Sequence, residues 1–358
     1  MSTRPSLKFP RHGVVGVAAA VALMIGLAGC ATPSVSPSGS ATPSVSPTPG
    51  AASPRPIFPV GCEQVLKTSA AQSAITPTVS LRVDEGTMPT SLLEAAYRQT
   101  GGLDCDWTAS STNSDGRADG VYLVVVPDSL DALKEYQKLS SVDGSAQCLP
   151  SSGTCWADFA VGTSWVSLSA SDSGTAPTAP AFASLVSEVT TSLTAATPTH
   201  DAWVPPSGSF SGSYFCDRTS AVAAHLQSVV GAAPDLSAGG TGGGPGTDVT
   251  AFQKTGAASC PWLFSKAATD DVELDVTTLP GGAWSIAGMN EWRVRPGGGT
   301  ALASVSVAGA DAARAGCATY GCSGYLSYRH SLISVGLNAP MSVSDFTTLL
   351  GKLLAGVS

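Results

Sequence analysis

Eight of the nine cysteines fall into two sets of four whose spacing repeats. The gaps between successive cysteines are 43, 43 and 7 residues in the first set and 44, 57 and 5 residues in the second. The first set is Cys62, Cys105, Cys148 and Cys155, and the second set is Cys216, Cys260, Cys317 and Cys322. A recurring order of two long gaps and one short gap is typical of a duplicated unit. The sequence therefore predicts two similar domains, each held by its own cysteines.

The residues around the cysteines also repeat in the same order. Cys-Asp-Trp at residues 105–107 matches Cys-Pro-Trp at residues 260–262. Each set is followed by a segment with one apolar helical face, formed by Phe182, Leu185, Val186, Val189 and Leu193 in one case and by Phe346, Leu349, Leu350, Leu353 and Val357 in the other. We place the first domain at residues 57–196 and the second at residues 214–358. Residues 197–213 between them have the Pro and Gly content of a linker.

The pairing of the cysteines is inferred from compartment and repetition, because four cysteines allow three pairings. Thiols oxidise outside the cytoplasmic membrane, and two domains that share a cysteine pattern should close in the same way. We predict the disulfides Cys62–Cys105, Cys148–Cys155, Cys216–Cys260 and Cys317–Cys322. The alternative is a zinc site, since cysteine pairs also bind metals. It is disfavoured because no histidine recurs beside the cysteines, and the Cys-x-x-Cys motif of redox enzymes is absent from the sequence.

Hydrophobic patterns predict an α+β fold, with helices packed on a mostly antiparallel sheet in each domain. In the first domain, helices are expected just after Cys62, over residues 89–99, and after a cap at Asp128 or Ser129. The continuous apolar run at residues 121–126 predicts a buried strand.

The second domain is expected to follow the same plan. Residues 222–230 have one apolar helical face, and residues 272–276 alternate between apolar and acidic side chains, as a strand with one solvated face does. The longer gap between the second and third cysteines predicts an added strand at residues 304–307.

The N-terminus has the layout of a secretory signal. Its first eleven residues include three basic and no acidic side chains, and the uncharged apolar run at residues 14–27 is shorter than the roughly 20 residues that a membrane-spanning helix needs. The tetrapeptide Leu-Ala-Gly-Cys at residues 27–30 resembles the lipobox of bacterial lipoproteins. This resemblance implies that residues 1–29 are a signal peptide and that lipid on Cys30 anchors the mature protein, since two or more acyl chains hold a protein stably on a membrane.

Residues 30–56 are almost wholly Ala, Thr, Pro, Ser, Val and Gly after the first cysteine, and they contain the repeat ATPSVSPSGS and ATPSVSPTPG. Such a segment cannot bury a core, and its prolines favour an extended chain. We therefore expect a disordered stalk, to which O-linked sugar can be added in some hosts. The domains would then stand on the outer face of the cytoplasmic membrane, in the cell envelope.

Removal of the signal leaves 15 basic residues against 26 acidic ones. This acidic balance argues against nucleic acid and against anionic lipid headgroups as partners. The expected partners are the membrane, through the lipid on Cys30, and an envelope ligand or protein that the sequence does not identify.

In outline, the exported region resembles uncharacterised actinobacterial lipoproteins in which a stalk carries secreted domains with an early cysteine and a later Cys-x-Trp. Cys62, Cys216 and the two Cys-x-Trp segments carry this likeness. The resemblance implies location and architecture, but it implies no reaction.

Few residues are candidates for catalysis. His200, His225 and His330 have no counterpart at equivalent places of the other domain, and the sequence contains neither a Gly-x-Ser-x-Gly elbow nor a His-Glu-x-x-His motif. A Ser/His/Asp triad assembled from distant residues remains open. We expect no cofactor and no metal site.

For four further features we favour a structural interpretation over a functional one. The run Gly-Gly-Thr-Gly-Gly-Gly-Pro-Gly at 239–246 lacks the Lys of a phosphate loop and is expected to be a flexible insertion. Asn113, Asp115 and Asp119 lack the closing glutamate of a calcium loop and are expected in a hairpin turn. A solvated strand face explains Asp270, Asp271, Glu273 and Asp275, and packing on a disulfide explains Trp107 and Trp262. A sugar-stacking role would require these two tryptophans to be exposed.

The sequence thus predicts a non-enzymatic ligand-binding or sensing module of the cell envelope, with a site between or within its domains. The alternative is an interaction or scaffolding lipoprotein that docks on a membrane complex, for which an exposed apolar patch would be the sign. An envelope enzyme comes third, since it would need a cleft with convergent ionisable groups. Ligand, partner, oligomeric state and biological process are not specified by the sequence.

Overall fold

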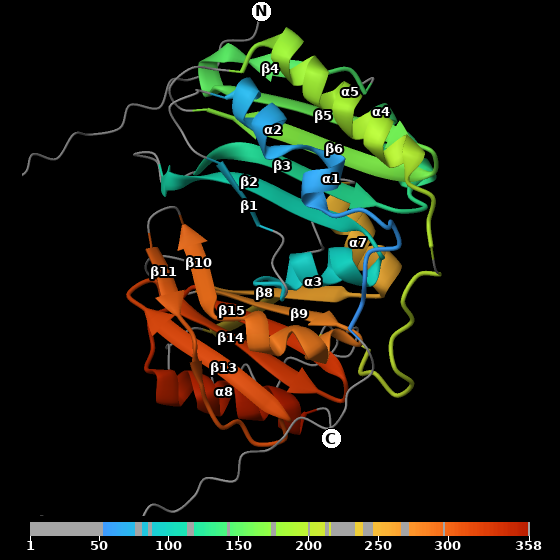
Figure 1. The fold of residues 1–358 in the computed structure, drawn as a ribbon. Coiled ribbons are helices and arrows are strands. Elements are labelled where there is room, and N and C mark those ends of the chain that lie inside the picture. Colours follow the sequence, from blue (N-terminus) through green and yellow to red (C-terminus); the bar gives the residue numbers. More distant parts are fainter. Residues whose placement is uncertain are drawn as a thin grey trace, which may run out of the picture. The chain divides into compact units, whose positions relative to one another are not determined.

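The computed structural model of the protein contains two antiparallel sheets and several helices (Figure 1). The structure describes residues 53–75, 81–84, 88–112, 118–141, 144–172, 177–199, 201–211, 215, 233–238, 246–265, 272–295 and 298–356. All the described residues belong to one compact unit, Pro49–Ser358.

The N-terminal sheet has six strands, in the spatial order β1-β2-β3-β6-β5-β4, and every neighbouring pair is antiparallel. The strands are β1 (Leu81–Asp84), β2 (Leu103–Thr112), β3 (Ala118–Val126), β4 (Gln147–Leu149), β5 (Thr154–Val161) and β6 (Ser164–Ser171). Alternate residues of the central strands are buried, as expected of strands with one face on a core.

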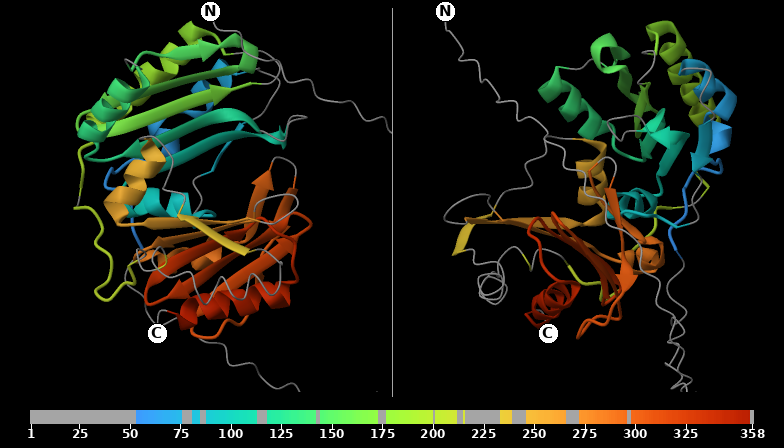
Figure 2. Two further views of the ribbon diagram at one scale, coloured as in Figure 1. Left: turned by 180° about the vertical axis from the view of Figure 1, so that it is seen from behind. Right: turned by 90° about the vertical axis from the view of Figure 1, so that its left-hand side faces the viewer.

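Helices cover both faces of this sheet. The core lies against α1 (Cys62–Val65), α2 (Thr68–Ala74) and α5 (Ala179–Ala195), whose Phe182, Leu185, Val189 and Leu193 are buried among the inward side chains of the strands. The other face is contacted by α4 (Leu130–Ser140) at one end of β5 and β6. In the right-hand view of Figure 2, the blue α1 and α2 with the yellow-green α5 lie on one side of the sheet and the green α4 on the other.

The C-terminal sheet has seven strands, in the order β12-β13-β14-β15-β9-β8-β7, again with every neighbouring pair antiparallel. The strands are β7 (Ala233–Ala238), β8 (Ala258–Ser265), β9 (Val272–Leu279), β12 (Ala303–Ser304), β13 (Ala312–Ala318), β14 (Gly321–Tyr328) and β15 (Ser331–Leu337). A separate hairpin consists of β10 (Glu291–Arg295) and β11 (Gly298–Ala301). Helix α8 (Val343–Ala355) buries its apolar residues against one face of the seven-stranded sheet.

A third apolar cluster joins the two sheets within the compact unit. It contains buried residues of α3 (Leu92–Gln99), Val126 at the end of β3, Ala251 of α7 (Thr247–Thr255), and Leu279 and Leu332 of the C-terminal sheet. The two helices contact each other, and α3 also contacts the 3₁₀ helix η3 (Gly282–Gly288). Packing of this kind makes the two sheets parts of one folded body.

The structure confirms a mixed fold of helices and antiparallel sheets with disulfides. Sulfur bridges link Cys62 to Cys105, Cys148 to Cys155 and Cys317 to Cys322, which are three of the predicted pairs. Cys260 is also disulfide-bonded, while its predicted partner Cys216 lies outside the described residues. The two short bridges join residues that face each other directly across an antiparallel pair, with Cα atoms 4.0 Å apart in both cases.

Several local predictions are refined by the structure. The helix expected over residues 89–99 begins at Leu92, because Ser91 caps it by accepting a hydrogen bond from the Glu94 amide. The strand expected at 121–126 extends back to Ala118, where it pairs with β2. The helix expected at 222–230 lies outside the described residues.

The insertion in the C-terminal half has a different form from the one expected. The predicted strand at 304–307 is the two-residue β12, and most of the additional chain forms η3 and the β10–β11 hairpin. The expected linker at 197–213 is packed rather than free, since the Thr199 amide donates to the Ile57 carbonyl (2.9 Å) and the Phe210 amide to the Arg329 carbonyl (3.2 Å).

Candidate functional site

A crevice of about 380 Å³ lies where the turn after β3 and the start of α4 meet α7. Its lining comprises Asp128, Ser129, Leu130, Asp131, Ala132, Thr163, Thr250, Gln253 and Lys254. The first six residues belong to the N-terminal half and the last three to α7. Both halves of the molecule are therefore needed to form it.

The N-terminal wall of the crevice is held by a tight turn at Asp128. Asp128 has a φ of 48°, in the left-handed region that non-glycine residues seldom adopt. The Ser129 amide donates to the Thr163 carbonyl (2.8 Å), and the Thr163 hydroxyl donates to Asp128 Oδ1 (2.8 Å). These two bonds tie the turn to the β5–β6 hairpin, which explains how the left-handed residue is maintained.

The α7 wall contributes the crevice's positive charge. Lys254 Nζ donates to the Asp128 carbonyl oxygen at 3.1 Å, a contact between residues 126 positions apart in the sequence. Thr250 is buried, whereas Gln253 and Lys254 are exposed. The lining of this partly open space is thus mostly polar, with one ammonium beside hydroxyl-bearing and acidic residues. Such a lining suits a small polar molecule better than an apolar one.

The crevice does not contain the parts of a nucleophilic catalyst. Its described lining includes hydroxyl groups but neither histidine nor cysteine that could act as a neighbouring base or nucleophile. Across the described part of the chain, no group of three or more His, Cys, Asp and Glu residues could hold a metal ion.

Ser129 stands at the predicted N-cap position of α4, but its side chain does not cap the helix. Its hydroxyl donates backwards to the Pro127 carbonyl (2.9 Å). The prediction of a helix start at this place was therefore correct in position and wrong in the capping contact, because the turn at Asp128 redirects the serine hydroxyl.

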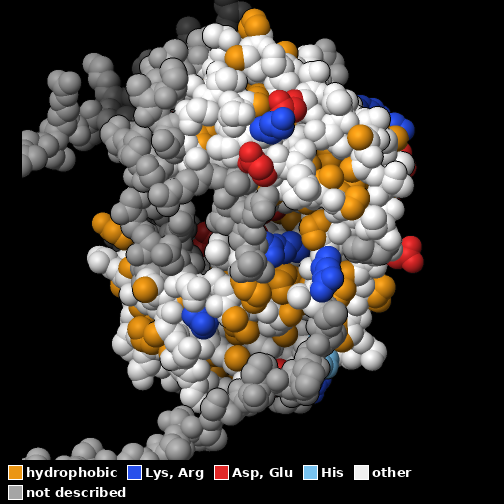
Figure 3. Space-filling model, in the orientation of Figure 1, with side chains coloured by type: hydrophobic (Ala, Val, Ile, Leu, Met, Phe, Trp, Pro, Cys, Tyr) orange, Lys and Arg blue, Asp and Glu red, His pale blue; other side chains and the backbone are white. Residues whose placement is uncertain are grey.

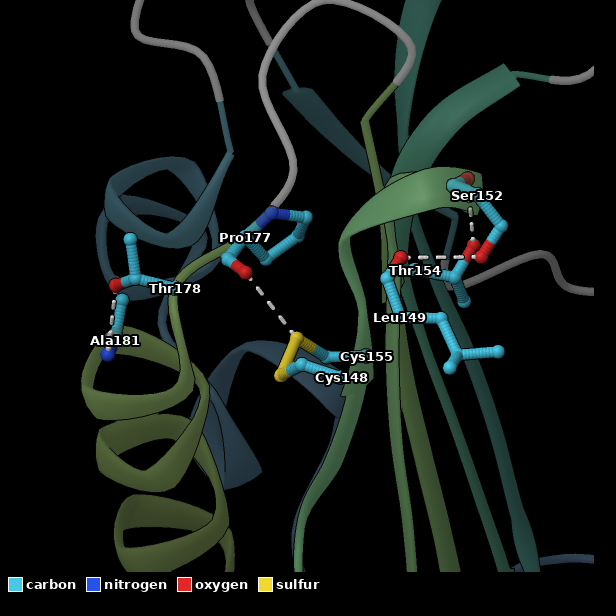
Figure 4. The surroundings of a disulfide bond; sticks show 8 residues. All are labelled: Cys148, Leu149, Ser152, Thr154, Cys155, Pro177, Thr178 and Ala181. Carbon is cyan, nitrogen blue, oxygen red and sulfur yellow. Dashed lines mark hydrogen bonds between the residues drawn. A yellow bond between two sulfur atoms is a disulfide. The ribbon is translucent and has the colours of Figure 1, made fainter.

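The disulfide between Cys148 and Cys155 lies between β4–β5 and the start of α5 (Figure 4). Cys155 is buried with its Sγ 3.3 Å from the Pro177 carbonyl, while Cys148 is partly exposed. Thr178 caps α5 by accepting from the Ala181 amide at 3.3 Å. The bridge therefore fixes the edge of the sheet beside the beginning of the helix that covers it, which is a structural role.

The two Cys-x-Trp tryptophans lie in the cores. Trp107 is 0% exposed in the cluster that contains Cys62 and Cys105, and Trp262 is 1% exposed in the cluster that contains Cys260. Their burial agrees with packing beside disulfides, and it excludes them as a platform for sugars.

The remaining candidate residues are scattered. His330 is exposed in the β14–β15 turn beside Arg329, and both have positive φ, of 63° and 45°. Asp119 lies in β3, next to the predicted hairpin turn. Outside the described residues are Cys30, His200, His225, Asn113, Asp115, Asp270, Asp271 and residues 239–245.

The predicted acidic strand face is present on β9. Glu273 and Asp275 alternate with the buried Val272, Leu274 and Val276, so they share the side away from the core under α8. Partial burial, and secondarily the charge of Glu273, raises the pKa of Asp275 above its ordinary value. The glycine-rich run precedes α7, whose first turn carries Asp248, a residue that would repel a phosphate.

No sequence signal pointed to the crevice. Thr163 and Lys254 come from a hairpin turn and from a helix of the other half, and neither belongs to a recognisable motif. Their proximity follows only from the packing of α7 beside β3.

Among the described residues, no helix combines the length and the apolar character that crossing a bilayer requires. Comparisons of the chain with protein-family models, with curated proteins and with solved structures found no match.

Proposed function

We propose that the protein is a lipid-anchored, extracytoplasmic binding module that holds a small polar ligand in the crevice between α4 and α7. The observation that carries this proposal is the lining of the crevice by both halves, with Lys254 reaching across to Asp128. A ligand that contacts both walls would stabilise their association by mass action, which is the property that a sensing module needs.

The location is supported by the N-terminal sequence and by the disulfides. The lipobox at residues 27–30 follows a basic segment and a short apolar run, in the order typical of exported lipoproteins. Disulfides persist in oxidising compartments and are rare in reducing ones. We therefore propose anchoring through Cys30 at the outer face of the cytoplasmic membrane, as in the actinobacterial lipoproteins that the sequence resembles.

We also propose that the two halves arose by duplication. The strand order β1-β2-β3-β6-β5-β4 has the same connectivity as β7-β8-β9-β15-β14-β13. The Cys-x-Trp segments lie on β2 and β8, and the short disulfides link β4 to β5 and β13 to β14. These correspondences support a tandem repeat in which the crevice is lined by two turns of the first copy and by α7 of the second.

The ligand site can be tested with the full-length lipoprotein in detergent. The protein would be incubated with the low-molecular-weight fraction of its host's envelope, from which oligosaccharides have been removed, and examined by native mass spectrometry. A bound mass that is lost on denaturation is the expected result. Lys254→Met should reduce its occupancy roughly tenfold, because a hydrogen bond to a charged group contributes about 1.5–3 kcal/mol.

Lys352→Met is the matched control, because Lys352 is an exposed lysine on α8 and outside the crevice. It should bind as the unaltered protein does. The proposed site would be contradicted if the unaltered protein shows only its ligand-free mass, or if Lys254→Met binds the ligand as well as the unaltered protein does.

A second function, docking on a protein partner, is favoured by one observation. Two of the exposed large apolar residues, Leu149 (50% exposed) and Tyr320 (77% exposed), lie within the two loops closed by the short disulfides. A rigid hairpin that presents an apolar side chain loses little entropy on binding. Figure 3 shows apolar side chains in small groups rather than one large patch on the face in view, so this function ranks second.

A further inference from the structure

The face of the N-terminal sheet opposite α1, α2 and α5 has a row of serines along a central strand. On β6, Ser167, Ser169 and Ser171 are partly exposed and alternate with the buried Val166, Leu168 and Ala170. We call these three serines the serine strip. A strand that packed against an apolar partner would carry apolar residues at these positions. At the start of β6 the same face is covered by α4, whose Tyr136 ring packs on the buried Trp165. Beyond α4, the serine strip indicates a face that meets water or a polar ligand.

Aromatic side chains flank the middle of the serine strip. Ser169 lies directly opposite Tyr122 of β3 and directly opposite Trp156 of β5. Residues that oppose each other in antiparallel strands project on the same face, and Tyr122 and Trp156 are both partly exposed. Neighbouring strands are spaced by about 4.8 Å, so the backbones at Tyr122 and Trp156 are roughly 10 Å apart.

This spacing suits one pyranose ring. A sugar ring has two faces of C–H groups and a rim of hydroxyls, so it can stack between two aromatic rings while its rim meets polar groups. Two stacking contacts of about 3.5–4.0 Å each fit within a separation of roughly 10 Å. The Ser169 hydroxyl at the floor can both donate and accept hydrogen bonds.

The charge of this face selects against anionic ligands. None of the four strands β2, β3, β5 and β6 contains a Lys, Arg or His residue. On the edge strand β1, Arg82 lies opposite Thr108 and Asp84 lies opposite Asp106, so β1 adds no net charge. Asp106 lies opposite Tyr122 in the same cross-strand row, and a carboxylate is a strong acceptor for sugar hydroxyls. A phosphate-rich or uronate-rich polymer would instead meet a negative surface with no counter-charge on these strands.

We propose that the serine strip binds an uncharged, extended glycan chain that runs along β6 from Ser169 towards Ser171, away from α4, with one sugar ring between Tyr122 and Trp156. A β-1,4-linked chain is extended and can follow a strand, whereas an α-1,4-linked chain coils away from it. This site is separate from the crevice, and it does not depend on the function proposed above.

The test uses the full-length lipoprotein in a polyoxyethylene detergent, because sugar-headed detergents would compete. Isothermal titration calorimetry would measure binding of hexamers of β-1,4-linked N-acetylglucosamine and of β-1,4-linked glucose. At least one of them should bind, and the α-1,4-linked glucose hexamer should bind at least about tenfold more weakly. Trp156→Ala should weaken binding roughly tenfold, through loss of stacking and of buried apolar area.

Two further variants separate binding from folding. Ser169→Leu fills the floor of the site but leaves both aromatic residues in place, and it should also weaken binding roughly tenfold. Val204→Ala shortens an apolar side chain that is 78% exposed in the segment between the two sheets, and it should leave binding unchanged. Circular dichroism would confirm that each variant is folded.

The proposal is overturned if neither β-1,4-linked hexamer binds at millimolar concentration. It is also overturned if folded Ser169→Leu binds as well as the unaltered protein. The monosaccharide of the hexamer that binds would be titrated in the same way. Equal affinity for the hexamer and for its monosaccharide would reject an extended chain and leave a monosaccharide as the ligand.

Discussion

The chain turns at Asp128 after β3 and at Gly281 after β9, and both residues have positive φ, of 48° and 71°. In each case the backbone next to the turn is bonded to a β-hairpin of the same sheet. The Ser129 amide donates to the Thr163 carbonyl at 2.8 Å, and the Ala283 amide donates to the His330 carbonyl at 3.0 Å. The two halves therefore use the same local device at corresponding ends of their sheets.

The surroundings of the two turns differ. A Cβ added at Gly281 would lie 2.5 Å from the Trp203 ring, so the connecting segment packs directly on this turn. The turn at Asp128 instead borders the crevice, where Lys254 is its contact from the other half. The same kind of turn is thus covered in one half and borders a candidate binding site in the other.

The largest effect that tests this comparison is expected from the two core tryptophans. Trp107→Ala and Trp262→Ala should each lower the free energy of unfolding by about 3–5 kcal/mol, because each removes a fully buried aromatic side chain and leaves a cavity. Unfolding in urea would be monitored by circular dichroism. If the halves are equivalent and joined through the shared cluster of α3 and α7, each variant should unfold in a single transition.

Two separate transitions, with each variant shifting only one of them, would show that the halves unfold independently. In that case the crevice would be a contact between two autonomous domains rather than a feature of one body. Leu139→Ala serves as the control, since Leu139 is 63% exposed and its removal should change stability little.

The sequence was most informative where structure depends on local pattern. A continuous apolar run located β3, alternation of apolar and acidic side chains located β9, and the apolar face at Phe346 located α8. Repetition of the cysteine spacing, together with the oxidising compartment, led to the pairs Cys62–Cys105, Cys148–Cys155 and Cys317–Cys322. These features depend on residues that are close in sequence or that chemistry limits to few partners.

Features that depend on distant packing could not be predicted in this way. The alternating serines of β6 were visible in the sequence, but their position between Tyr122 and Trp156 depends on the register of strands far apart in the chain. The crevice requires α7 to pack beside β3, and no periodicity specifies which helix of one half meets which strand of the other. Both candidate sites therefore became visible only in the structure.

A smaller effect is expected at Gly288, where η3 approaches the chain before α3. A Cβ on Gly288 would overlap the Pro89 carbonyl oxygen and would lie 3.0 Å from the Met88 side chain. Gly288→Ala should therefore push the two halves apart at this contact and lower the free energy of unfolding by about 1–3 kcal/mol. Gly336→Ala is the matched control, because a Cβ at Gly336 meets no atom within 4 Å.

Measurement of thermal unfolding would compare the two glycine variants, and hydrogen exchange would show where protection is lost. Loss of protection should include α3 and α7, because both belong to the cluster that joins the sheets. Equal stability of the two variants would mean that this approach of η3 to Pro89 is not needed for the association of the halves.

The smallest effect is expected at Asp275 of β9. Asp275 lies opposite Gly336 and Pro261. In the other sheet, Tyr122 of β3 lies opposite Ser169 and Asp106. Because partial burial and Glu273 raise the pKa of Asp275 in the folded protein, its contribution to stability is fully present below the unfolded pKa of about 3.9 and is lost as the pH rises through the folded value. Asp275→Asn does not titrate, so it should raise Tm by about 1 °C at pH 7, and this gain should disappear near pH 3.5. Asp311→Asn, at an exposed residue beside β13, is the control. A gain that is independent of pH would show that the ionised carboxylate of Asp275 is tolerated as well as its protonated form, so the two sheets would not differ at this position through charge.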